Sequence, residues 1–97
     1  MQQLEISLTT LKEWIENKTP FTLIDIREEE ERQASHMGGE WIPLSELSGR
    51  VDELPDSPIV FYCRSGARSL RATTYLRDAL QRENIYSLAG GMIGAGL

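Results

Sequence analysis

The sequence predicts an α/β protein built around a mainly parallel sheet, and three observations support this class. Short apolar runs typical of strands alternate along the chain with segments of helical spacing, which is the order typical of parallel sheets. The most apolar of these runs, residues 59–62, suits a central strand that is covered on both faces. A short glycine-containing loop and a long helical segment follow this run directly.

The amino-terminal quarter predicts a strand, a helix and a second strand. Residues 4–6 can form a short edge strand, and Ser7 is a suitable helix cap. The helix after Ser7 has apolar residues at helical spacing, which are Leu8, Leu11, Trp14 and Ile15. Pro20 ends this unit, and residues 21–26 are mostly apolar and β-branched, as expected of a buried strand.

The segment that follows is polar and broken by glycine and proline. Residues 28–31 are four consecutive glutamates, which we interpret as a solvated helical turn rather than a site for a metal or a basic partner. Residues 41–43 form a brief predicted strand after a glycine-containing loop. Ser45 can cap a helix that runs to about Leu54, before two prolines break the chain.

The second half of the chain predicts two further strands around one long helix. After the strand at residues 59–62, a helix is expected to run to about Arg82, with an apolar inner stripe and arginines outside. Residues 84–88 give the last strand, which residues 89–91 close. Neither a repeat nor a linker divides the chain, so residues 1–97 are predicted to form a single domain.

Composition points to a reducing compartment. The chain is 40% apolar and 26% charged, which is ordinary for a globular protein, and no apolar run approaches the ~18 residues that a membrane span needs. The first residues have neither the basic start nor the apolar stretch of a secretory signal. A single cysteine cannot form an internal disulfide. We therefore expect a cytoplasmic protein.

The net charge of −5 argues against nucleic acid and against anionic membranes as general partners. The charge is uneven, however, because residues 57–82 contain five arginines and one acid. A positive segment on an acidic protein predicts a local anion site.

The loop after the central strand has the features of an anion receptor around a nucleophile. Backbone amides at a helix start lack partners and carry the positive end of the helix dipole. If the loop curls around Cys63, with Gly66 permitting the turn, those amides converge on the sulfur and stabilise its thiolate. Arg64 and Arg68 add positive charge that can fork onto an oxyanion.

Cys63 could also be a structural residue or a metal ligand. A cysteine at a strand end is often only a small buried hydrophobe, but that explanation leaves the two arginines, the glycine and the helix start unexplained. One cysteine and one histidine cannot build a zinc site, so no metal is expected. No glycine-rich nucleotide loop is present, and no organic cofactor is expected either.

The loop at residues 63–69 and three further motifs together resemble the rhodanese family of sulfurtransferases. Residues 63–69, Cys-Arg-Ser-Gly-Ala-Arg-Ser, are similar to the active-site loop of that family. Three flanking motifs occur in the family's order, at residues 23–28, at residues 36–44 and at residues 88–92. The resemblance therefore covers nearly the whole chain.

The resemblance implies a three-layer α/β/α fold around a five-stranded, mostly parallel sheet. It implies that Cys63 is the catalytic nucleophile and carries sulfur as a persulfide. The implied substrate-binding residues are Arg64, Ser65, Gly66, Ala67, Arg68 and Ser69. Within this set Arg68 would close the loop and Arg64 would face the incoming anion.

The resemblance also assigns structural roles outside the loop. Asp25 and Arg27 would tie the second strand to neighbouring loops, and a catalytic carboxylate at Asp25 is the less favoured interpretation. His36 would anchor a loop by a hydrogen bond rather than act as a base. The chain lacks the tryptophan that the family often has after its closing Gly-Gly, so the packing of the carboxyl terminus is not predicted.

Three functions follow as hypotheses. The first is a sulfurtransferase that moves sulfane sulfur from a small anionic donor such as thiosulfate to a thiol or cyanide acceptor. The second is a phosphatase on the same fold, which the loop disfavours because four residues separate Cys63 from Arg68 where the phosphatases have five. The third is a non-catalytic interaction module, although such modules usually lack the cysteine.

The tight spacing around Trp41 resembles rhodanese modules of enzymes that activate sulfur carriers, which suggests a sulfur-carrier or sulfur-relay protein as a partner.

Overall fold

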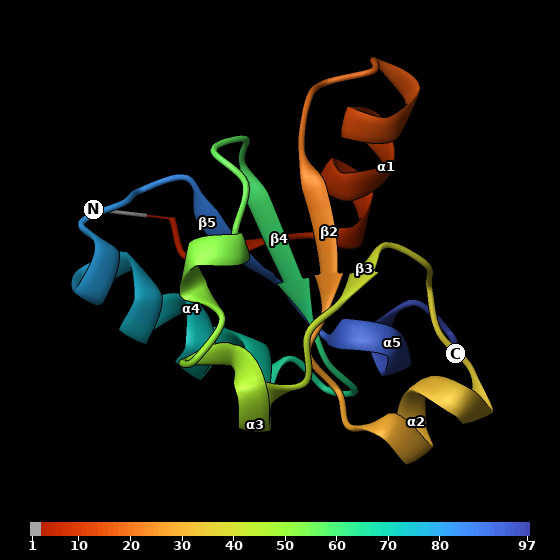
Figure 1. Ribbon diagram of the computed structural model, residues 1–97. Helices are drawn as coiled ribbons and strands as arrows, with labels where there is room; N and C mark the ends of the chain where they lie inside the picture. Colours follow the sequence, from red (N-terminus) through yellow and green to blue (C-terminus); the bar gives the residue numbers. More distant parts are fainter. Residues whose placement is uncertain (1–2) are drawn as a thin grey trace.

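A computed structural model describes residues 3–97 and places five strands of that range in one sheet (Figure 1). The strands are β1 (Glu5–Ile6), β2 (Thr22–Asp25), β3 (Glu40–Trp41), β4 (Ile59–Tyr62) and β5 (Ile85–Leu88). Their order across the sheet is β1-β5-β4-β2-β3, and each neighbouring pair is parallel. The predicted α/β class is confirmed, and residues 59–62 form the central strand. Residues 1 and 2, which belong to the amino-terminal segment considered for a signal, lie outside the described range.

Helices cover both faces of this sheet, so the fold has three layers. They are α1 (Leu8–Glu16), α2 (Glu29–Ala34), α3 (Leu44–Leu47), the 3-10 helix η1 (Val51–Glu53), α4 (Ala67–Leu80) and α5 (Gly91–Gly94). Figure 1 shows α3 and α4 on one face of the sheet, α1 and α5 on the other, and α2 beyond the carboxyl ends of the strands. Within residues 3–97, no helix combines the length and the apolar character needed to cross a membrane.

The central strand explains why its sequence is a continuous apolar run. All four residues of β4 are buried, and successive side chains of a strand point to opposite faces. Ile59 and Phe61 join the core cluster beneath α3 and α4, whereas Val60 and Tyr62 join the cluster beneath α1 and α5. Both faces of β4 therefore need apolar residues, and the two core clusters fix the carboxyl end of the strand from both faces of the sheet.

The helix that was expected from Ser45 to Leu54 is instead two short helical segments. Helix α3 begins at Leu44, after Pro43, and ends at Leu47, before η1 begins. Ser45 does not cap a helix, because it lies inside α3, and its hydroxyl donates a hydrogen bond of 2.9 Å to Glu28 Oε1. Gly49 separates the two segments, and glycine is a poor residue for a helix interior.

The sequence did not predict α5, which fixes the backbone beside Cys63. The amide of Met92 donates to the Cys63 carbonyl at 3.0 Å, and the amide of Ile93 donates to the Arg64 carbonyl at 2.9 Å. Gly91 has φ of +54°, and a Cβ added there would overlap the Cys63 carbonyl and lie 2.6 Å from the Arg64 carbonyl oxygen. The closing Gly-Gly motif therefore allows a helix start to press directly against the loop.

This contact predicts that alanine at Gly91 costs more stability than alanine at a matched glycine. Gly38 is the control, because its φ of +88° is also left-handed but a Cβ there would meet no atom within 4 Å. Gly38→Ala should lose about 1 kcal/mol from backbone strain, and Gly91→Ala roughly 2 kcal/mol more from overlap with the loop. Urea unfolding of the two variants measures the difference. Equal losses would show that α5 does not press on the loop as described.

Candidate active site

Cys63 lies at the carboxyl end of β4, between the central strand and α4. Gly66 precedes the first residue of α4 and has φ of +99°, as expected for the tight curl that the sequence predicts. A Cβ at Gly66 would lie 3.1 Å from the Gly90 amide nitrogen, so the turn is also closely packed. The start of α4 is thereby brought against the cysteine.

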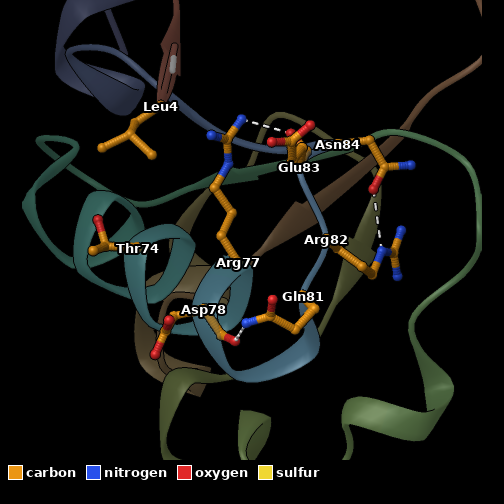
Figure 2. Close-up of a pocket in the computed structure, with 8 residues that line it drawn as sticks. All are labelled: Leu4, Thr74, Arg77, Asp78, Gln81, Arg82, Glu83 and Asn84. Carbon is orange, nitrogen blue, oxygen red and sulfur yellow. Dashed lines mark hydrogen bonds between the residues drawn. The ribbon is translucent and has the colours of Figure 1, made fainter. Parts of the chain in front are cut away.

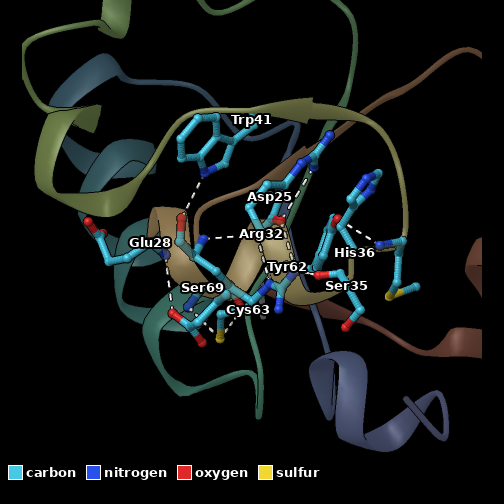
Figure 3. A network of polar contacts seen from close by, with 12 residues as sticks. Asp25, Glu28, Arg32, Ser35, His36, Trp41, Tyr62, Cys63 and Ser69 are labelled. Carbon is cyan, nitrogen blue, oxygen red and sulfur yellow. Dashed lines mark hydrogen bonds and ion pairs between the residues drawn. The ribbon is translucent and has the colours of Figure 1, made fainter.

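Backbone amides converge on the Cys63 sulfur. The Gly66 amide donates to Sγ at 3.1 Å. The Ser69 amide donates to it at 3.4 Å, and Figure 3 shows Ser69 beside Cys63. The thiol lies 3.5 Å from the Ser69 hydroxyl oxygen. The amide cradle that the sequence predicts around Cys63 is present.

These contacts favour the thiolate of Cys63. Burial is the largest single influence on the Cys63 pKa, and it acts to raise it. The Ser69 side chain and the backbone amides of Ser69, Gly66 and Arg68 form hydrogen bonds that together outweigh burial. The pKa of the Cys63 thiol therefore lies below its ordinary value. The arrangement can hold a sulfur anion at the start of a helix.

The other loop residues fall into an exposed group and a packed group. Arg64, Ser65 and Ala67 are exposed, whereas Cys63 has no exposed surface and Ser69 is also fully buried. The exposed residues form the solvent side of the loop, and the buried ones form its floor.

The sequence predicts that Arg68 can fork onto an oxyanion. In the structure its guanidinium instead forks onto the carboxylate of Glu31. Both nitrogen–oxygen distances are 2.8 Å, and each side chain is 30% exposed. Hydrogen bonding to Arg68 is the largest cause that lowers the Glu31 pKa, to about 2. Glu31 is therefore not a solvated helix residue. A capping box at Glu28 holds its carboxylate toward the loop, and this packing across 37 residues is not visible in the sequence.

Not all the arginines of the positive segment, residues 57–82, lie at the predicted anion site. Arg77 and Arg82 line a separate pocket at the far end of α4 (Figure 2), about 20 Å along the helix from its start. Arg77 donates to the carbonyls of Ile85 at 2.8 Å and Glu83 at 2.6 Å, and Arg82 donates to Asn84 at 3.1 Å. These two arginines hold the turn between α4 and β5, so they do not belong to the anion site.

Asp25, Arg27 and His36 have the structural contacts that the resemblance implies. Asp25 is fully buried and accepts two hydrogen bonds of 3.1 Å from the Arg27 side chain, which also donates to the carbonyl of Ser35 (Figure 3). His36 Nδ1 accepts the Gly38 amide at 2.9 Å, which is the loop-anchoring bond expected of it. This network supports the loops around the site.

The parallel sheet and its cysteine loop define a class, an α/β protein with a thiolate-stabilising loop at the carboxyl edge of the sheet. A family model described as a rhodanese-like domain matches residues 7–94, and the chain belongs to this rhodanese-like family. YtwF of Bacillus subtilis is 36% identical over 100 residues, which cover 96% of this chain and 90% of the relative. A sulfurtransferase of Allochromatium vinosum is 33% identical, over 92% of this chain and 84% of the relative.

A solved structure agrees with this assignment. The thiosulfate sulfurtransferase of Pseudomonas aeruginosa superposes with a TM-score of 0.82 at 26% identity. The match covers 97% of this chain and 19% of the Pseudomonas protein, so it is confined to one part of that protein. The family to which the chain belongs thus includes sulfurtransferases.

The Glu31–Arg68 ion pair predicts a specific acid sensitivity. The pKa of Glu31 is about 2 in the folded protein against 4.5 for an unperturbed glutamate, so the pair stabilises the fold above about pH 4.5. That stability is lost as the pH falls toward about 2. Glu31→Gln should lose roughly 1–2 kcal/mol at neutral pH and should unfold with a weaker pH dependence over this range. Glu30→Gln is the control, because Glu30 is exposed on the same helix. If both variants kept the wild-type acid profile in urea unfolding, the ion pair would contribute nothing.

Proposed function

We propose that the protein is a sulfurtransferase that moves sulfane sulfur from a small anionic donor, such as thiosulfate, to a thiol or to cyanide through a persulfide on Cys63. The observation that carries this proposal is the convergence of the Gly66 and Ser69 amides on the Cys63 sulfur. A site that stabilises a sulfur anion suits a nucleophile that must also leave as a thiolate.

In the first step the Cys63 thiolate attacks the outer sulfur of the donor. The new sulfur–sulfur bond forms as the donor's own sulfur–sulfur bond breaks, and sulfite departs from thiosulfate with the electron pair. No proton is transferred in this step, so no general base is required. This agrees with the position of His36, whose Nδ1 is occupied by the Gly38 amide.

In the second step the acceptor attacks the outer sulfur of the persulfide. The bond from Cys63 to that sulfur breaks, and the electron pair returns to Cys63 as a thiolate. The amides that stabilise the resting thiolate thereby lower the energy of this leaving group. The chain has no second cysteine, so the persulfide cannot collapse into an internal disulfide and waits for an external acceptor.

The loop residues have divided roles in this proposal. Arg64 is exposed and would attract the anionic donor, while Ser65 and Ala67 complete the solvent side of the loop. Arg68, paired with Glu31, would hold the loop in shape rather than bind the donor through both nitrogens. Because Cys63 has no exposed surface, the donor would approach it from the exposed side of the loop, at Arg64 and Ser65.

The physiological setting proposed is a sulfur relay in a reducing compartment such as the cytoplasm. A free cysteine as the sole thiol is compatible with such a compartment. A protein thiol or a sulfur-carrier protein is the class of acceptor that would draw sulfur from a persulfide without a further cofactor. The support for this chemistry is the similarity to relatives named as sulfurtransferases, one of them a thiosulfate sulfurtransferase.

Intact-mass spectrometry after incubation with excess thiosulfate tests the proposal. The mass should rise by one sulfur atom per chain, and cyanide should remove that atom with release of thiocyanate. Cys63→Ser should gain no sulfur, because its hydroxyl does not ionise near neutral pH. Ser48→Ala is the matched control, since Ser48 is exposed at the end of α3, outside the Cys63 loop, and this variant should still acquire the sulfur. A chain that hydrolyses an aryl phosphate rapidly and never gains sulfur would favour the phosphatase alternative and overturn the proposal.

A further inference from the structure

A second buried serine lies directly behind the Cys63 loop, on a different element. Ser87 of β5 is fully buried, and its hydroxyl oxygen is 2.7 Å from that of Ser69. Ser69 in turn lies 3.5 Å from the Cys63 sulfur. The three side chains form a line from the interior of the sheet to the sulfur. Ser87 belongs to neither the cysteine loop nor the motifs through which the sequence resembles its family.

The hydrogen positions in this line follow from counting donors and acceptors. Among residues 3–97, Ser69 is the hydrogen-bond partner found for the Ser87 hydroxyl. A buried hydroxyl proton without an acceptor is costly, so Ser87 donates and the Ser69 oxygen accepts. The single proton of Ser69 is then left for its other two neighbours, the Gly66 carbonyl at 3.2 Å and the Cys63 sulfur at 3.5 Å.

The choice between those two neighbours depends on the charge of Cys63. While Cys63 is a thiol, its own proton points to Ser69, and Ser69 donates to the Gly66 carbonyl. Once Cys63 is a thiolate, a hydrogen bond to the charged sulfur is the stronger one, and the Ser69 proton turns toward it. The bond from Ser87 polarises the Ser69 hydroxyl and keeps its proton from being directed back at β5.

We propose that Ser87 is a positioning residue of the site, which acts through Ser69 to direct a hydroxyl proton at the Cys63 thiolate. This inference rests on the proposed function, in which that thiolate is both the nucleophile and the leaving group. Ser87 itself touches no substrate, because it is covered on all sides.

Charged groups close to the loop remain the same whether or not Ser87 carries a hydroxyl. Helix α5 and strand β5 contain no charged residue, and Tyr86 of β5 packs against Trp14. The ionisable groups on the loop, on α2, β2 and β4, and on the first two turns of α4 are Asp25, Glu29, Glu30, Glu31, Arg32, Tyr62, Arg64, Arg68 and Arg71, and Arg27 pairs with Asp25 beside them. None of them contacts Ser87 in the hydrogen bonds and ion pairs of residues 3–97. A change in the titration midpoint of Cys63 when Ser87 is replaced therefore reports the contacts from Ser87 through Ser69 to the sulfur.

The test is a pH titration of the thiolate ultraviolet absorbance, taken as a difference from Cys63→Ser. The wild-type midpoint should lie below the free-cysteine value of about 8.5. Ser87→Ala should raise this midpoint by roughly 0.5–1 pH unit, and Ser69→Ala should raise it further. Adding Ser87→Ala to Ser69→Ala should move it no further, because Ser87 acts only through Ser69.

A threonine and valine pair at position 87 separates the hydroxyl from packing. The two side chains have nearly the same shape, so both strain the core alike, but Ser87→Thr should keep the wild-type midpoint and Ser87→Val should match Ser87→Ala. Equal midpoints for threonine and valine, or additive shifts with Ser69→Ala, would overturn the inference. The titration uses no sulfur donor. Its failure would leave the persulfide result intact, and absence of a persulfide in a protein with the expected shifts would refute only the proposed function.

Discussion

The site depends on one constraint: the amides at the start of α4 must reach the sulfur at the end of β4. The distances of 3.1 Å from Gly66 and 3.4 Å from Ser69 require a turn of only a few residues. That turn needs the left-handed backbone of Gly66 and the close approach of Gly91 from α5. The buried central strand supplies a fixed end point, and burial on both faces keeps it in register with its neighbours. The turn between β4 and α4 therefore contributes both to the stability of the fold and to the stabilisation of the Cys63 thiolate.

The arginines near the loop illustrate how one residue type takes different roles. Arg68 is neutralised by Glu31, so the pair fixes α2 against the loop and leaves little net charge there. Arg64 is exposed and has the freedom that an anion collector needs. Arg77 is buried against backbone carbonyls, where a guanidinium can satisfy several acceptors at once. The local positive charge of the sequence therefore exaggerates the positive charge available at the site.

Local features of the sequence predicted most of the fold. The apolar run of β4, the cap at Ser7 and the glycine of the loop each act within a few residues, and the structure has the strand, the helix and the turn that they predict. The features that the sequence did not predict are mostly contacts between segments distant in the chain. Glu31 meets Arg68 across 37 residues and Ser69 meets Ser87 across 18. Two of the four residues of α5 are glycine, so its sequence carries almost no helical signal. Ser87 was predicted only as part of the last strand, because its contact with Ser69 depends on how β5 packs against α4.

The convergence of amides on the Cys63 sulfur can be observed directly by nuclear magnetic resonance. Backbone amide shifts of Gly66 and Ser69, followed against pH, report the charge of the atom to which they donate. We predict that both amides shift with one common midpoint below about 8.5, that the Gly49 amide, which donates to the Glu46 carbonyl, does not follow them, and that Cys63→Ser removes the response. A midpoint at or above the free-cysteine value, or amides of Gly66 and Ser69 that ignore the ionisation of Cys63, would contradict it.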